Sequence, residues 1–171
     1  AISLQKSFSE LKKAGISHIV MEVSSHSLDQ YRVADVDYDI AIFTNLTPEH
    51  MDYHITMESY YQAKSRLFRM LDIHSTAIIN ISDTYGLRMI KETTAPYITF
   101  SKDDKQSIHF SNIICSINGI SGTIVAGSTE YKINSDLVGE FNSENILSAV
   151  SAAHTLGIDK DFITEGINTC D

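Results

Sequence analysis

The stretch YDIAIFT, residues Tyr38–Thr44, decides the fold class of this chain. It is a short and nearly continuous apolar run, which is typical of a strand that is buried on both faces of a parallel sheet. Three further runs have the same character, namely His18–Val23, Thr76–Asn80 and Tyr97–Phe100. Strands that alternate with helices predict βαβ units, so we expect an α/β fold with a mostly parallel sheet flanked by helices.

Helical patterns lie on both sides of these runs. Residues Phe8–Ala14 indicate the end of a helix that Gly15 closes. Residues Thr56–Leu71 predict a longer helix with an apolar stripe, an N-cap threonine and a glutamate in the first turn. A third helix is expected to begin after Gly139 and to end at Gly157.

The pattern changes to antiparallel strands in the second half of the chain. The runs Ile113–Ile117 and Ile120–Val125 flank the dipeptide Asn118-Gly119, which is a strong signal for a two-residue hairpin loop. Residues Tyr131–Ile133 predict a further strand. We therefore expect a small antiparallel β subsection near residues 107–137.

Composition indicates a soluble globular protein. The chain has 171 residues, of which 43% are hydrophobic and 20% charged, and no apolar run approaches the roughly 20 residues that cross a bilayer. A net charge of −9 argues against nucleic acid or an anionic membrane as the main partner, although phosphate ligands remain compatible with it. Cys115 and Cys170 lack metal-site spacing and are expected to be buried or partly buried thiols in a reducing cytosol. The start AISLQKSF lacks an initiator methionine, so we expect an internal piece of a longer polypeptide.

Polar side chains follow three of the predicted strands. The first run ends in Glu22–His26, the second is followed by Thr44-Asn45 and by Pro48–His54, and the third ends in Asn80–Asp83. Ligands of open parallel sheets bind beyond the carboxyl ends of the strands. These segments are therefore expected to meet at one edge of the sheet.

Two charged residues stand in apolar patterns. Glu22 is either an oxygen ligand for Mg²⁺ or a carboxylate bonded to local backbone. Lys64 falls on the apolar stripe of its helix, so it either extends its amine to water, forms an ion pair, or has reacted with CO₂ to give a carbamate that faces Mg²⁺. His50, Asp52 and His54 alternate along a connection, but a solvated polar loop is the more common explanation for such a triplet.

Four segments resemble motifs of the Mur ligase family. They are MEVSSHSLDQYRV (21–33), FTNLTPEHMDYH (43–54), YYQAKSRLF (60–68) and GEFNSENILSAVSAA (139–153). They occur in the family's order, at compatible spacing, and cover nearly the whole chain. The combination is far more specific than any one motif.

The resemblance implies an ATP-dependent amide-bond ligase of peptidoglycan precursor synthesis. Such an enzyme adds the third amino acid, diaminopimelate or lysine, to UDP-MurNAc-L-Ala-D-Glu through an acyl phosphate. ATP and Mg²⁺ are the implied cofactors, and the implied location is the cytoplasm, with no nucleic acid partner and no membrane insertion.

The resemblance also implies roles for individual residues. The implied metal ligands are Glu22, His50 and Lys64. Lys64 would be the carbamylated lysine and would act with His50 as a catalytic group. The implied contacts to the UDP-linked substrate are Ser24, Gln30 and Arg32. The implied contacts to the nucleotide are Asn45, Asn142 and Asn145. Helix capping would explain the last two asparagines without a nucleotide, and turn formation would explain the serine and the glutamine.

Two departures from the family pattern limit what the chain can do. The family has aspartate where this chain has Glu49, and no G-x-x-x-x-G-K-[ST] loop occurs in the sequence. Residues 1–171 are therefore expected to be part of a central ATP-binding domain. The N-terminal UDP-binding domain, the P-loop and the C-terminal amino-acid-binding domain would lie elsewhere in the same polypeptide, and the isolated chain is expected to be inactive.

Two other functions stay open at this point. One is another ligase of the same superfamily, related to folylpolyglutamate or cyanophycin synthetases, although the serines and histidine of 24–26 and the Gln30-x-Arg32 pair argue against it. The other is a non-catalytic module that binds a nucleotide-sugar. A G-x-x-x-x-G-K-T loop shortly upstream in the reading frame would favour the enzyme.

Overall fold

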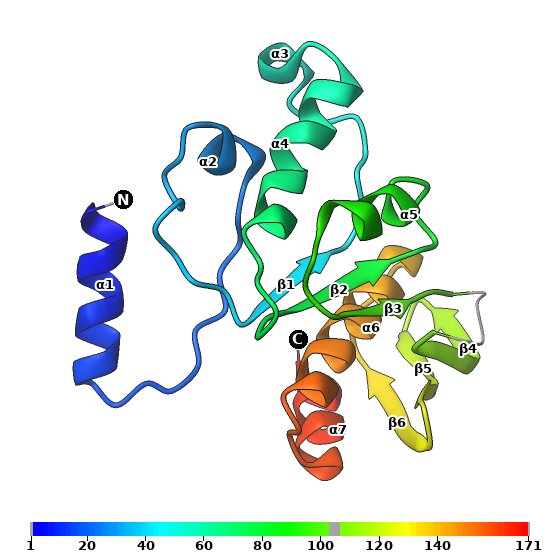
Figure 1. The fold of residues 1–171 in the computed structure, drawn as a ribbon. Helices are drawn as coiled ribbons and strands as arrows, with labels where there is room; N and C mark the ends of the chain where they lie inside the picture. Colours follow the sequence, from blue (N-terminus) through cyan, green and yellow to red (C-terminus); the bar gives the residue numbers. More distant parts are fainter. Residues whose placement is uncertain (1, 103–106, 171) are drawn as a thin grey trace.

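The computed structural model describes residues 2–102 and 107–170, which form an α/β fold with two sheets (Figure 1). The elements in chain order are α1 (Ile2–Lys13), α2 (Ser25–Asp29), β1 (Ile40–Phe43), α3 (Met51–His54), α4 (Met57–Arg69), β2 (Thr76–Asn80), α5 (Gly86–Met89), η1 (Ile90–Glu92), β3 (Tyr97–Phe100), β4 (His109–Ser116), β5 (Gly119–Ala126), β6 (Thr129–Ser135), α6 (Glu140–Thr155) and α7 (Lys160–Asn168). The predicted fold class is confirmed.

The first sheet is parallel, with the strand order β1-β2-β3. Its middle strand β2 explains the continuous apolar run in the sequence. Ile78 and Ile79 are both fully buried, but they belong to different hydrophobic clusters because successive side chains point to opposite faces. The sheet is therefore covered on both sides.

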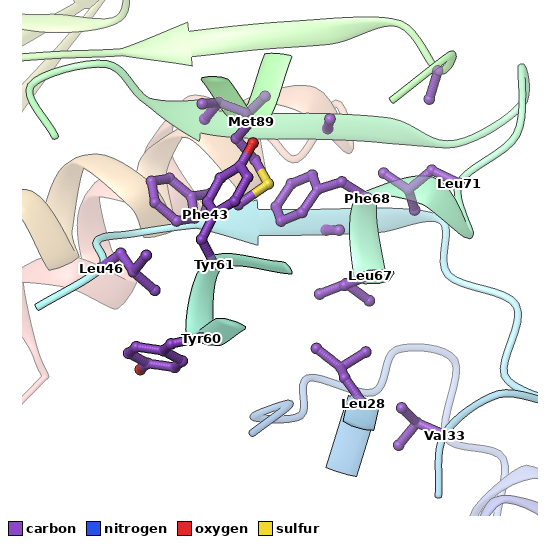
Figure 2. Packing of buried hydrophobic residues seen from close by; sticks show 14 residues of the cluster. Leu28, Val33, Phe43, Leu46, Tyr60, Tyr61, Leu67, Phe68, Leu71 and Met89 are labelled. Carbon is purple, nitrogen blue, oxygen red and sulfur yellow. The ribbon is translucent and has the colours of Figure 1, made fainter. Parts of the chain in front are cut away.

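Helix α4 covers one face and α6 helps to cover the other. Tyr61 and Phe68 of α4 pack with Phe43 of β1 and with Met89 (Figure 2). On the opposite face Leu147 of α6 packs into a second cluster with side chains of the antiparallel sheet. Burying apolar area on this scale is the main contribution to folding.

The second sheet is antiparallel, with the order β4-β5-β6, which confirms the predicted subsection. A bridge between Phe100 and Ile108 connects it to β3. The predicted loop residues are shifted by one, because Ser116 pairs with Gly119 and the loop consists of Ile117 and Asn118. The positive φ, +125°, is at Gly119. The backbone conformation that glycine adopts most readily is therefore needed at the first residue of β5 and not in the loop.

The predicted strand His18–Val23 is wrong. Within the described part of the chain this segment forms no strand and pairs with no other strand, and Val20 is 98% exposed. Apolar sequence predicts burial, but a strand also needs a neighbour to pair with. Residues 16–20 are exposed, whereas Met21 and Val23 are partly buried against the cluster that contains the side chains of α4.

The predicted helices are confirmed as α1, α4 and α6. Thr56 caps α4 by accepting a hydrogen bond from the backbone N–H of Ser59. Gly15 and Gly157 follow α1 and α6 with φ of +80° and +69°, the left-handed conformation that ends helices. Among the described residues, no helix has the length and apolar content that crossing a membrane requires. The expected burial of the two cysteines is wrong, because Cys115 lies in the exposed part of β4 and Cys170 is exposed after α7.

Candidate functional site

The carboxyl ends of β1 and β2 are joined by side chains at the end of β2 and just after it. Asn80 donates a hydrogen bond from Nδ2 to the backbone oxygen of Thr44, 2.7 Å away. The carboxylate of Asp83 accepts a hydrogen bond of 2.9 Å from the backbone N–H of Leu46. The segment that carries the exposed Asn45 is thereby held against the neighbouring strand end.

Lys64 is half-buried on the inner side of α4, as the helix pattern predicts. Burial lowers the pKa of its amine, and the negative charges of Glu22 and Glu49 oppose that shift. Its Nζ lies 5.9 Å from the centroid of the Tyr60 ring. Because the pKa is lowered, a larger share of the amine is neutral at a given pH, and the neutral amine is the form that reacts with CO₂.

Glu22 is exposed and acts on Lys64 through its charge, although these two described side chains form no ion pair, so the expectation of a carboxylate inside a buried strand is wrong. In residues 2–102 and 107–170 no backbone N–H donates to its carboxylate, so the local-backbone alternative does not hold either. His50 is exposed beside the ring of Tyr60, at a centroid distance of 6.2 Å. Lys64 is thus a neighbour of Glu22 and borders the same aromatic ring as His50.

Three imidazoles pack together near this point. The ring of His26 lies 4.8 Å from that of His50 and 5.6 Å from that of His54, measured between centroids. His54 is buried, and its Nε2 lies 2.8 Å from the hydroxyl of Ser25. Burial, followed by the charge of His26, lowers the pKa of His54. The solvated-loop explanation is therefore wrong for His54, which is buried, and Asp52, although exposed, lies on the short helix α3 and not in a loop. His50 is exposed and directly precedes this helix.

Ser24 and Gln30 bracket the short helix α2. The Ser24 hydroxyl caps the helix by accepting a hydrogen bond of 3.2 Å from the N–H of Ser27. Gln30 ends the helix and donates from Nε2 to the hydroxyl of Tyr53 at 3.4 Å. Capping and turn formation account for both residues, and neither contact excludes a ligand.

Arg66 holds the end of α2 against α4, a contact that sequence reasoning missed. Its guanidinium donates to the backbone oxygens of Leu28 and Asp29 and forms an ion pair of 3.1 Å with the Asp29 carboxylate. The helix pattern puts Arg66 on the solvent side, and nothing local marks this role. Arg32 follows on an exposed turn and has no ion-pair partner among the residues that the structure describes.

Left-handed backbone is concentrated in these segments. Among the described non-glycine residues, positive φ values occur at Tyr31 (55°), His50 (56°) and Ile55 (64°). Such conformations cost free energy in residues with a side chain, most of all in a β-branched one, and are common at ligand sites. Tyr31 lies between the candidate substrate residues Gln30 and Arg32, His50 is itself a candidate metal residue, and Ile55 directly follows α3.

The first two turns of α6 carry the remaining candidates. Asn142 donates from Nδ2 to the backbone oxygen of Val138 at 2.8 Å, and Asn145 donates to Oδ1 of Asn142 at 2.9 Å. The N-cap residue of α6 is Gly139, which has no side chain that could accept a hydrogen bond from the first N–H groups of the helix. The capping explanation for the two asparagines is therefore not what the structure shows.

A magnesium ion fits the charges around Lys64 if this lysine carries a carbamate. No group of three or more His, Cys, Asp or Glu side chains in the described residues is arranged to bind a metal ion. With Lys64 as an amine, Glu22 and Glu49 face a positive charge. As a carbamate, it would instead add anionic oxygens beside these carboxylates, and such oxygens are the ligands that Mg²⁺ prefers.

The fold and these side chains define an α/β domain whose polar groups gather beyond the ends of parallel strands, the usual place for a ligand. The chain belongs to the Mur ligase family, since the Mur ligase middle domain matches residues 1–153.

Similar proteins agree with this assignment. The chain is 39% identical over 173 residues to a UDP-N-acetylmuramoyl-L-alanyl-D-glutamate–2,6-diaminopimelate ligase of Geobacter metallireducens, covering 98% of this chain and 34% of that protein. The ligase of the same name from Bacillus cereus is 37% identical over 169 residues, covering 95% of this chain and 34% of the relative. The chain thus spans about a third of the length of these relatives.

Solved structures show the same fold. A UDP-N-acetylmuramoyl-L-alanyl-D-glutamate–2,6-diaminopimelate ligase superimposes with a TM-score of 0.89 at 29% identity, over 99% of this chain and 36% of that one. MurF from Acinetobacter baumannii superimposes with a TM-score of 0.71 at 17% identity, over 78% of this chain and 29% of that one. The second likeness concerns the fold alone.

Proposed function

We propose that this chain is part of an ATP-dependent ligase that adds diaminopimelate to UDP-MurNAc-L-Ala-D-Glu in the cytoplasm. The observation that carries the proposal is the surroundings of the half-buried Lys64. The charges of Glu22 and Glu49 act on its amine, and the ring of Tyr60 lies next to both Lys64 and His50. The names of the relatives support diaminopimelate over lysine as the third amino acid.

The reaction has two steps. The terminal carboxylate of the dipeptide attacks the γ-phosphorus of ATP, so that an acyl phosphate forms and ADP leaves. The amine of diaminopimelate then attacks the acyl carbon, loses a proton and expels phosphate, which leaves an amide. The protein's work in such transfers is mainly positioning and charge neutralisation.

The residues of this chain divide that work. Glu22, His50 and the carbamate on Lys64 would hold Mg²⁺, which offsets the negative charge that gathers between ATP and the carboxylate. The UDP-linked substrate is held next to α2 by Ser24, Gln30 and Arg32. Asn45, Asn142 and Asn145 contact the nucleotide.

The rest of the active site would come from other parts of the same polypeptide. We propose that residues 1–171 are part of a central ATP-binding domain, completed by a P-loop, a UDP-binding domain and an amino-acid-binding domain. The sequence contains no G-x-x-x-x-G-K-[ST] loop to cradle the β- and γ-phosphates. The purified chain alone is therefore expected neither to hydrolyse ATP nor to ligate.

The direct test uses a full-length polypeptide that contains this chain. Phosphate release should require ATP, Mg²⁺, UDP-MurNAc-L-Ala-D-Glu and diaminopimelate together, and the product should gain the mass of one diaminopimelate residue. Binding of the nucleotide-sugar without turnover would instead indicate the non-catalytic module. Turnover with lysine in place of diaminopimelate would correct the third amino acid only.

Arg32→Ala in that polypeptide is expected to raise KM for the UDP-linked substrate about tenfold, with little change in kcat, because Arg32 supplies a charge-assisted contact in both ground and transition states. Steady-state kinetics with the UDP-linked substrate varied would measure it. Lys132→Ala, at an exposed position of β6, is the matched control and should change neither constant. An unchanged KM for Arg32→Ala would remove Arg32 from the substrate site.

A further inference from the structure

Asn80 is a buried polar side chain at the centre of the strand ends. It is the last residue of β2, the middle strand, and is 1% exposed. Its Nδ2 donates to the backbone oxygen of Thr44 at 2.7 Å and to Oε2 of Glu144 at 3.3 Å. Its Oδ1 accepts from the backbone N–H of Ser82 at 2.9 Å. Both donor positions and the acceptor of this carboxamide are in use.

These partners belong to different parts of the fold. Thr44 directly precedes Asn45, and Glu144 directly precedes Asn145 on α6. Segments about a hundred residues apart in the chain are thus joined by one carboxamide. A buried amide is costly to leave without partners, so its bonds fix the spacing between the segment after β1 and the first turns of α6.

The charge of Glu144 is compensated from two sides. Its Oε1 lies 3.2 Å from Nζ of Lys102, which also contacts Glu140 at 3.1 Å, while Oε2 faces Asn80. A carboxylate beside Asn145 would otherwise repel a polyphosphate. Asn80 and Lys102 together keep both oxygens of Glu144 engaged with the protein.

We propose that Asn80 is a positioning residue for the nucleotide. Its carboxamide sets the distance between Asn45 and the asparagine pair of α6, Asn142 and Asn145, so that both sides contact one purine nucleotide at once. The inference rests on the proposed function, because it takes these three asparagines as the nucleotide contacts. It adds a residue that touches no ligand itself.

Asn80→Asp in a full-length polypeptide that contains this chain tests the inference. The change keeps the size of the side chain but removes both donors, so that oxygen faces the Thr44 carbonyl and the Glu144 carboxylate. KM for ATP should rise about tenfold or more, while KM for the UDP-linked substrate stays within about twofold. Asn112→Asp, at an exposed position of β4, adds the same charge and should change neither constant. A general loss of folded enzyme would lower kcat with both KM values unchanged, which would overturn the positioning role.

A second substitution should reverse the effect. In the double variant Asn80→Asp/Glu144→Gln, the new amide can donate to the new carboxylate, so KM for ATP should recover by at least about threefold relative to Asn80→Asp alone. If Asn80→Asp does not fold, Glu144→Ala breaks the same link from a less buried position and should raise KM for ATP. A Glu144→Ala variant with the normal KM for ATP would overturn the inference.

Hydrogen exchange on the same protein without ligands separates this inference from the proposed function. Asn80→Asp should speed exchange both at residues 44–47 and at residues 140–146, whether or not the protein ligates. Faster exchange at both segments supports the link even if no ligase activity is found. If the exchange rates change neither at residues 44–47 nor at residues 140–146, the inference is wrong. That result would leave the proposed ligase function intact.

Discussion

Lys64→Ala in a full-length polypeptide that contains this chain is expected to lower kcat for ligation by about 100-fold or more, the size of effect seen when a residue that tunes a metal site is removed. Burial lowers the pKa of the Lys64 amine, which favours the neutral form that CO₂ modifies. Removing the side chain removes the carbamate and leaves Glu22 and Glu49 facing the nucleotide with one anionic metal ligand fewer. Initial rates at saturating substrates measure the loss.

One further variant and one rescue experiment show whether the charge at position 64 is positive or negative. Lys64→Arg keeps a cation that cannot form a carbamate, so it should be as inactive as Lys64→Ala, whereas a simple ion-pair role would let it retain activity. Adding bicarbonate or a short carboxylate to Lys64→Ala should restore part of the rate. Lys91→Ala, on exposed η1, should behave like the unsubstituted protein. Normal turnover by Lys64→Ala would end the carbamate assignment.

The sequence predicts the elements whose pattern and neighbours agree. β2 is buried on both faces, as its unbroken apolar run indicates, and α4 presents its apolar stripe to the sheet. His18–Val23 has the same kind of run but no partner strand in the described residues, so the pattern alone led to a wrong prediction. Periodicity gives the preferred surroundings of a segment, whereas pairing depends on residues far away in the chain.

The candidate site was predictable to a similar degree. The rule that ligands bind beyond strand ends led to the correct prediction that Asn45 and Asn80 lie at one edge of the sheet. The helical periodicity likewise predicted correctly that Lys64 faces inward. The contacts that fix these positions were not predictable, because they join side chains to distant backbone. Arg66 anchors α2 from the side that was expected to face water, and the charge of Glu49, in a loop, acts on Lys64 although no sequence pattern indicates it.

Gly86→Ala should destabilise the fold by about 3 kcal/mol, the upper end of the usual cost of forcing an extra group into a packed site. Gly86 is buried at the start of α5, and an added Cβ would overlap the backbone oxygen of Asn80 and lie 2.9 Å from its carbonyl carbon. Backbone of a central strand cannot move aside cheaply, whereas a flexible side chain could. Urea unfolding of a full-length polypeptide that contains this chain, followed by circular dichroism, would measure the free energy of unfolding.

Gly166→Ala is the matched control, because it is the same substitution in a helix with nothing within 4 Å of the new Cβ. Alanine favours helix over glycine, so this variant should gain roughly 0.5–1 kcal/mol. Equal stability of the two variants would mean that the chain after β2 does not pack against Asn80 as closely as the structure has it. The same result would weaken the positioning role of Asn80, since a backbone that yields to a methyl group cannot hold Thr44 and Glu144 at fixed distances.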